Sequence, residues 1–153
     1  REVDYGPDEN KTDDEVMLRL GQVYPAKEGK NPSEMSEDAL TDVGRHVIDL
    51  WNEKAIVPDG WKVSPEDCIH AWMKFGEKVF KNFHGENIMV VSSNGVIRFA
   101  PYLTGDFNGF AGEHDIKVTT GGVCVFERED DEENWHCTEW NVKPKKYFES
   151  LPD

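Results

Sequence analysis

The chain has 153 residues and a formal net charge of −14, from 17 Lys and Arg against 31 Asp and Glu. This length favours a single domain, residues 1–153, with one sizeable core. The negative charge removes the electrostatic driving force for binding nucleic acid or anionic lipid, so neither a nucleic acid nor a membrane is an expected partner. Hydrophobic residues make up 37% of the sequence, which is enough for a globule beneath an acidic surface.

The cysteine and histidine positions contain no metal-site spacing. An odd number of cysteines without a zinc or redox motif predicts free thiols in a reducing compartment, the cytoplasm. No apolar run reaches the roughly 18 residues needed to span a membrane, and the first residues do not form a signal peptide. No metal and no cofactor are expected. The residues concerned are Cys68, Cys124, Cys137, His46, His70, His84, His114 and His136.

The first half of the chain is predicted to be helical. Thr12–Glu15 has the form of a capping box, and apolar residues follow at helical spacing, so a short helix begins near Thr12. Residues 24–36 have the composition of a loop. Apolar residues recur at three and four over Leu40–Trp51, predicting a helix that Pro58–Gly60 ends. Ser64 and Pro65 then start a third helix.

The second half is predicted to contain strands. Ile88–Val91 is apolar without alternation, which is typical of a central strand in a parallel sheet. Val96–Ala100 is predicted to be a helix that Pro101 disturbs. A further strand is expected over Ile116–Val118. A closing antiparallel hairpin is expected over 122–128 and 135–142, around the acidic run 129–133.

The turn between this strand and the next helix is the most informative stretch. Ser93, Asn94 and Gly95 would place backbone N–H groups of a helix N-terminus beyond the carboxyl end of a strand, where anions bind in open α/β sheets. Arg98 would add a charge, or would pair with an acid instead. An ordinary strand-to-helix connection is the simpler alternative.

A second group of candidate residues is acidic and lies at the start of the chain. Its members are Glu2, Asp4, Asp8 and Glu9. The simplest interpretation of such a cluster is a solvated loop.

Three segments resemble the histidine phosphatase superfamily, the phosphoglycerate-mutase-like proteins. Residues 90–98 read VVSSNGVIR, similar to the family's Val-Val-Ser-His-Gly-Gly-Val-Ile-Arg motif. Residues 1–12 resemble its mid-chain segment, and residues 121–126 with Trp135 resemble its closing hairpin. Two positions of the motif differ, because Ser93 stands where the second histidine belongs and Asn94 replaces a glycine.

The resemblance implies a three-layer α/β/α domain with a mostly parallel central sheet, closed by the C-terminal hairpin and lacking the family's N-terminal strand. It also implies phosphoryl hydrolysis or transfer on a small phosphorylated metabolite through a phosphohistidine. Glu2 would be the general acid, and Ser93, Asn94, Gly95 and Arg98 would bind the substrate or a phosphate ion. The Arg-His-Gly motif that supplies the nucleophile is absent, so this chain alone is expected to be inactive.

Three classes of function therefore remain open. The intact protein is a phosphatase or mutase, or a catalytically dead pseudo-phosphatase that acts as a binding module, or a structural acidic domain. If the nucleophile-bearing strand is missing, the edge of strand Ile88–Val91 needs cover. The expected partner is the missing N-terminal segment or a second copy of the chain.

Overall fold

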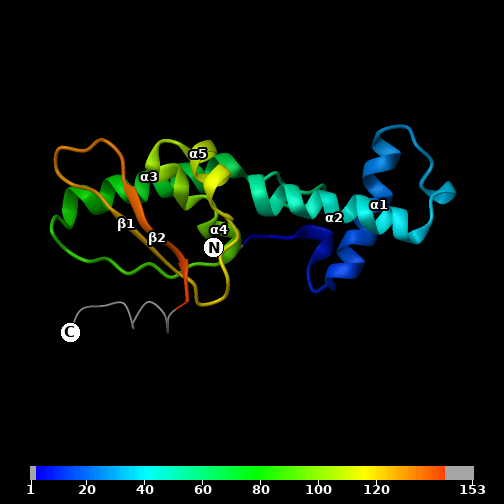
Figure 1. Ribbon diagram of the computed structural model, residues 1–153, viewed down its shortest axis with the longest axis horizontal. Coiled ribbons are helices and arrows are strands. Elements are labelled where there is room, and N and C mark those ends of the chain that lie inside the picture. Colours follow the sequence, from blue (N-terminus) through cyan, green and yellow to red (C-terminus); the bar gives the residue numbers. More distant parts are fainter. Residues whose placement is uncertain (1–2, 144–153) are drawn as a thin grey trace. The chain divides into compact units, whose positions relative to one another are not determined.

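The computed structural model describes residues 3–143, which divide into two packed units (Figure 1). The N-terminal unit comprises residues 3–63, and the described part of the C-terminal unit comprises residues 64–143. The expectation of a single domain stays a prediction. No helix within residues 3–143 combines the length and the apolar character needed to cross a membrane.

Two helices, α1 (Asp13–Lys27) and α2 (Glu37–Lys54), form the N-terminal unit. The predicted capping box is confirmed, because the Thr12 hydroxyl accepts the Glu15 N–H and the Glu15 carboxylate accepts the Thr12 N–H at 2.9 Å. The loop predicted from residue 24 begins later than expected. α1 continues through Pro25 because N–H groups of Glu28 and Lys30 satisfy carbonyls of its last turn.

The second predicted helix is also confirmed as α2. Ser36 caps its start by accepting the Ala39 N–H at 3.2 Å. The helix ends at Ala55, which adopts a left-handed conformation with φ of 54°, rather than at the predicted Pro58–Gly60. The core of the unit lies between the two helices, with Tyr24, Ile48 and Trp61 packed around buried Val16, Leu20 and Val47.

The C-terminal unit begins with the third predicted helix, α3 (Pro65–Asn82). The Ser64 hydroxyl accepts the Asp67 N–H at 3.1 Å at its start. Two short helical segments follow later, α4 (Asn94–Ile97) and the 3-10 helix η3 (Ala100–Thr104). Pro101 occupies the first turn of η3, where its missing N–H costs nothing, so it starts a helix rather than disturbing one.

The rest of the unit comprises α5 (Phe107–Glu113) and a hairpin of β1 (Val123–Glu127) and β2 (His136–Val142). The predicted antiparallel hairpin is confirmed, and its register shifts between neighbouring pairs. Buried apolar side chains of η3, α5 and the following segment form the core: Ala100, Leu103, Phe107, Ile116 and Val118.

The predicted three-layer α/β/α fold is wrong. Among the described residues the sheet has two strands, β1 and β2, and they are antiparallel. Ile88–Val91 belongs to no helix or strand and is exposed. An apolar run becomes a central strand only when neighbouring strands and helices cover it. Within residues 3–143 no strand pairs with Ile88–Val91.

The predicted strand over Ile116–Val118 is also absent, although Ile116 and Val118 are buried. Side chains, rather than a neighbouring strand, form hydrogen bonds with the backbone groups of this segment. Asn94 Oδ1 accepts the Val118 N–H at 2.9 Å, and Asn141 Nδ2 donates to the Lys117 carbonyl at 3.2 Å. The apolar residues that suggested a strand are therefore core residues of an irregular segment.

Candidate functional site

The candidate turn has the geometry of a helix start. Ser93 is extended, with φ of −87° and ψ of 156°, and its carbonyl accepts the N–H groups of Val96 and Ile97 at 3.0 and 2.9 Å. The N–H groups of Asn94 and Gly95 make no hydrogen bond to any residue that the structure describes. The turn therefore has two adjacent backbone donors without an acceptor among the described residues, one of them on the buried Gly95.

The side chain of Asn94 has a structural role. Its Oδ1 holds the buried Val118 N–H, and the Trp72 indole N–H of α3 donates to the Val96 carbonyl at 2.9 Å. These two bonds attach α4 to the core segment and to α3. Asn94 is thus available to a ligand through its backbone N–H, while its side chain fixes the position of the turn.

Ser93 has an unusual environment for an N-cap residue. Its hydroxyl oxygen is buried and has no hydrogen-bond partner among residues 3–143, and it caps no N–H of α4. The N-cap serines of α2 and α3 both accept a backbone N–H. A buried hydroxyl without a partner is unfavourable and suits a site that an acceptor completes.

Arg98 lies at the C-terminal end of α4, where its N–H donates to the Asn94 carbonyl at 3.2 Å. The residue is only 1% exposed, so its guanidinium is not a surface cation. A charge at such depth needs compensation from neighbouring groups. The four predicted binding residues therefore lie on one short segment, on which the Arg98 side chain is buried. They are Ser93, Asn94, Gly95 and Arg98.

The predicted general acid, Glu2, lies outside the described residues. For the other members of the acidic cluster, the interpretation as a solvated loop is wrong at one position. Asp4 and Glu9 are exposed and accept nearby backbone N–H groups, whereas Asp8 is 6% exposed.

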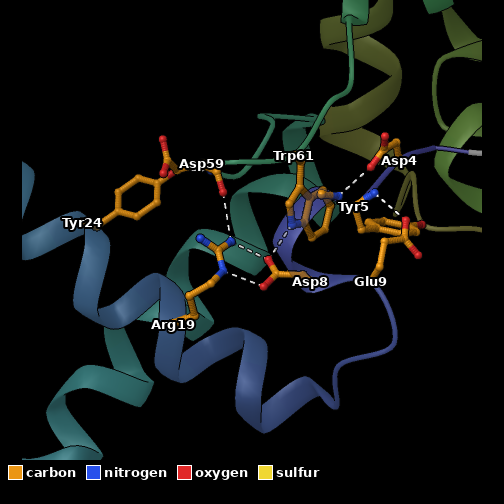
Figure 2. Close-up of polar contacts among 9 residues, drawn as sticks. Asp4, Tyr5, Asp8, Glu9, Arg19, Tyr24, Asp59 and Trp61 are labelled. Atoms are coloured by element: carbon orange, nitrogen blue, oxygen red, sulfur yellow. Dashed lines mark hydrogen bonds and ion pairs between the residues drawn. The ribbon is translucent and has the colours of Figure 1, made fainter.

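Asp8 is the centre of a polar cluster within the N-terminal unit, shown in Figure 2. Its carboxylate forms an ion pair with Arg19 of α1 and accepts the Trp61 indole N–H at 2.7 Å. Arg19 also donates to the Asp59 carbonyl at 2.9 Å. The hydrogen bond with Asp8 raises the pKa of Arg19, so the guanidinium remains charged.

The cluster was not predicted because its members are far apart in the sequence. Asp8 and Trp61 are 53 positions apart, and neither Arg19 nor Asp59 belongs to a recognisable motif. The sequence nevertheless contains one signal for this cluster. Trp61 directly follows the turn Pro58–Gly60, which comes after α2. The Asp8 carboxylate is occupied by Arg19 and by the Trp61 indole, so the cluster stabilises the fold.

Three of the five histidines lie next to an acid or a backbone carbonyl. His136 Nε2 lies 2.9 Å from Glu132 Oε1, and His84 Nδ1 lies 3.2 Å from Asp130 Oδ1. His114 Nδ1 is 3.2 Å from a backbone carbonyl. Within residues 3–143 no group of three His, Cys, Asp or Glu side chains is arranged to hold a metal ion.

Comparisons with protein-family models, with curated proteins and with solved structures find no match to this chain.

Proposed function

We propose that this chain supplies the phosphate-binding turn of a cytoplasmic protein that hydrolyses or transfers a phosphoryl group of a small phosphorylated metabolite. The observation that carries the proposal is the buried Ser93 hydroxyl without a partner, next to the available N–H groups of Asn94 and Gly95. The cytoplasmic location is supported by three free cysteines, Cys68, Cys124 and Cys137.

These donors suit the oxygens of a phosphate group. Two adjacent N–H groups and one hydroxyl supply three hydrogen bonds from neutral groups, and Gly95 has no side chain to obstruct the approach. The net charge of −14 opposes anion binding, so the affinity is weak at low ionic strength. The turn therefore positions a phosphate rather than capturing it from dilute solution.

A phosphohistidine mechanism needs a nucleophilic imidazole, a proton donor for the leaving oxygen, and donors around the phosphoryl oxygens. The turn at Ser93 supplies the third of these, and the resemblance assigns the proton donor to Glu2. Ser93 in place of a cationic histidine removes one charged donor, which costs about 10²–10³ in rate by analogy with the loss of one oxyanion donor. The proposed reaction is weakened by this replacement but retains its phosphate contacts.

The second candidate function is a binding module derived from such a phosphatase. It is favoured by Ser93 itself, because no imidazole stands at the turn to contact a transferring phosphoryl group. Assays with an aryl phosphate on the intact protein separate the two. Turnover that Glu2→Gln abolishes identifies the enzyme, and phosphate binding without turnover identifies the module.

The test of phosphate binding compares Ser93→Ala with Ser92→Ala, an adjacent exposed serine that makes no hydrogen bond to the described chain. Removing the Ser93 hydroxyl eliminates one donor to the phosphate, and we expect the affinity for inorganic phosphate, measured by calorimetry, to fall about tenfold. Ser92→Ala should bind as the unmodified chain does. Equal affinity in both variants, or no binding at millimolar phosphate, would contradict the proposal.

A further inference from the structure

The chain between α3 and α4 is exposed over nearly its whole length (Figure 1). Every residue from 81 to 92 is exposed, which is the longest such run within residues 3–143. Its apolar side chains are also open to solvent, with exposed fractions of 39% for Ile88, 87% for Met89, 47% for Val90 and 82% for Val91. An enzyme can therefore reach both the side chains and the backbone of this segment.

The backbone of residues 87–92 is also unpaired. None of its N–H or C=O groups forms a hydrogen bond with any residue that the structure describes. Other exposed connections have internal hydrogen bonds. Between α1 and α2, the Glu34 N–H donates to the Asn31 carbonyl at 3.1 Å, and in the hairpin loop the Glu132 N–H donates to the Glu129 carbonyl at 3.2 Å. Residues 87–92 therefore need no local unfolding to free their backbone.

An exposed and unpaired backbone is what an endoprotease requires of a folded substrate. The enzyme binds the chain in an extended form through backbone hydrogen bonds, and a pocket selects the side chain before the cleaved bond. A segment whose backbone is buried or hydrogen-bonded must first open locally. Residues 87–92 read NIMVVS, with no proline and no glycine, and the exposed fractions alternate with the period of an extended strand.

From these observations we infer that Ile88–Val91 is a cleavage site, in the folded chain, for an endoprotease whose pocket accepts an aliphatic side chain. Residues 82–97 contain no Lys and no Arg, so a protease that selects a basic residue has no bond to cut there. Cleavage is a hydrolysis: one C–N bond breaks, and water supplies the new carboxylate of one fragment and the new amino group of the other. This inference does not depend on phosphate binding at the turn.

Contacts within the C-terminal unit hold the two fragments together after cleavage. The Trp72 indole N–H of α3 donates to the Val96 carbonyl at 2.9 Å. The Arg128 guanidinium donates to Glu77 of α3 at 2.8 Å, and its carbon lies 3.9 Å from the centre of the Phe80 ring. Each contact joins α3, which precedes the cut, to a segment that follows it. Cleavage therefore leaves these contacts in place, and the cut chain remains one particle.

The experiment treats the native 153-residue chain with a small amount of an elastase, a protease with a small specificity pocket, and identifies the fragments by intact mass spectrometry. Within residues 3–143, the first bond cut should follow one of residues 88–91. The internal control is Ile56, an aliphatic residue that is 49% exposed but whose N–H donates to the Leu50 carbonyl at 3.3 Å. Cleavage at Ile56 should be at least about tenfold slower, because its backbone must first open.

Two variants of equal charge test the preference for aliphatic residues. Val90→Asp with Val91→Asp should slow elastase cleavage of the segment at least about tenfold, whereas Asn87→Asp with Ser92→Asp should leave the rate within about twofold. Size-exclusion chromatography then tests the cut chain, whose fragments should elute together in native buffer and separate in urea.

Three results would overturn the inference. The first is a native chain that resists the elastase under conditions that cut the denatured chain. The second is a first cut elsewhere within residues 3–143, or equal slowing in the two variants. The third is separation of the fragments in native buffer, which would show that the contacts of α3 do not hold the cut chain together.

Discussion

Individual buried polar groups decide the local structure of both units. In the N-terminal unit, the Asp8 carboxylate is almost fully buried and holds Arg19 and the Trp61 indole in place. In the C-terminal unit, the Asn94 side chain holds Val118. Sequence patterns did not predict either contact, because a single Asp or Asn looks the same in a sequence whether it is solvated or buried.

The Asp8 contact predicts a large effect on stability. Asp8→Ala leaves the Arg19 charge and the Trp61 N–H without their partner in a buried site, which should cost about 3 kcal/mol of unfolding free energy. Asp42→Ala removes an acid that is 73% exposed and pairs with Arg45 on the surface of α2, so its cost should stay below about 1 kcal/mol. Urea denaturation followed by tryptophan fluorescence measures both, and equal losses would contradict the assignment.

Cys137 predicts a dependence on pH. Burial, together with nearby Cys124, raises the pKa of the Cys137 thiol to about 12. Because the unfolded thiol has a pKa of about 8.5, the neutral folded thiol contributes stability that is lost as pH rises from that value towards 12. At pH near 8 the thiolate is scarce, so alkylation should be at least about 100-fold slower than in the denatured chain.

Mass spectrometry after timed treatment with iodoacetamide, followed by digestion, resolves Cys137 from the other two cysteines. The denatured chain serves as the reference for each site. If Cys137 in the folded chain reacted as fast as in the denatured chain, its burial in the hairpin would be disproved.

At the scale of elements, local signals predicted α1, α2, α3 and the β1–β2 hairpin but not α5, and they failed for the parallel sheet. Thr12, Ser36 and Ser64 are caps that act on residues three positions away, so the starts of α1, α2 and α3 can be found without the rest of the fold. A strand depends on partners elsewhere in the chain. The hairpin of β1 and β2 was found because its partners are close in sequence, whereas Ile88–Val91 has no strand partner within residues 3–143.

The contact between α1 and α2 depends on two glycines that the helical periodicity does not mark. A Cβ at Gly44 would lie 1.8 Å from the Met17 carbonyl oxygen, and a Cβ at Gly21 would lie 1.9 Å from that of Leu40. Each helix therefore places a glycine against a backbone carbonyl of the other. Backbone atoms cannot rotate away as a flexible side chain can, so any larger residue must separate the helices.

Gly44→Ala should therefore destabilise the N-terminal unit by about 1–3 kcal/mol through overpacking, even though alanine favours a helix more than glycine does. Gly112→Ala in α5 is the control, because nothing lies within 4 Å of its added Cβ. It should be neutral or stabilise by up to about 1 kcal/mol. Thermal unfolding followed by circular dichroism compares the two, and a neutral Gly44→Ala would refute the close approach.

At the scale of the whole molecule, the acidic composition acts on every proposed interaction. A net charge of −14 weakens phosphate binding at the turn, and this repulsion decreases as salt is added. The same charge predicts that nucleic acid is not a partner. It could not identify the candidate site, because Ser93, Asn94 and Gly95 are uncharged.

The candidate site was predicted from the sequence as a turn, but its surroundings were not. The small polar residues at 93–95 indicated a helix start, and α4 confirms this. The apolar run Ile88–Val91 predicted that the turn follows a central strand, whereas the residues before it are exposed coil. The contact of Asn94 with Val118 spans 24 positions and depends on tertiary packing, so no local pattern could reveal it.

The most direct measurement of the proposed function follows the backbone amide resonances of the chain while inorganic phosphate is added at constant ionic strength. Phosphate binding at the turn should cause saturable shifts at Asn94 and Gly95, whose N–H groups have no acceptor within the described chain, and at Ser93 beside them. Ser93→Ala should reduce the affinity derived from these shifts. Shifts confined to other residues, or none at millimolar phosphate, would contradict the account and identify the turn as a connection between two segments.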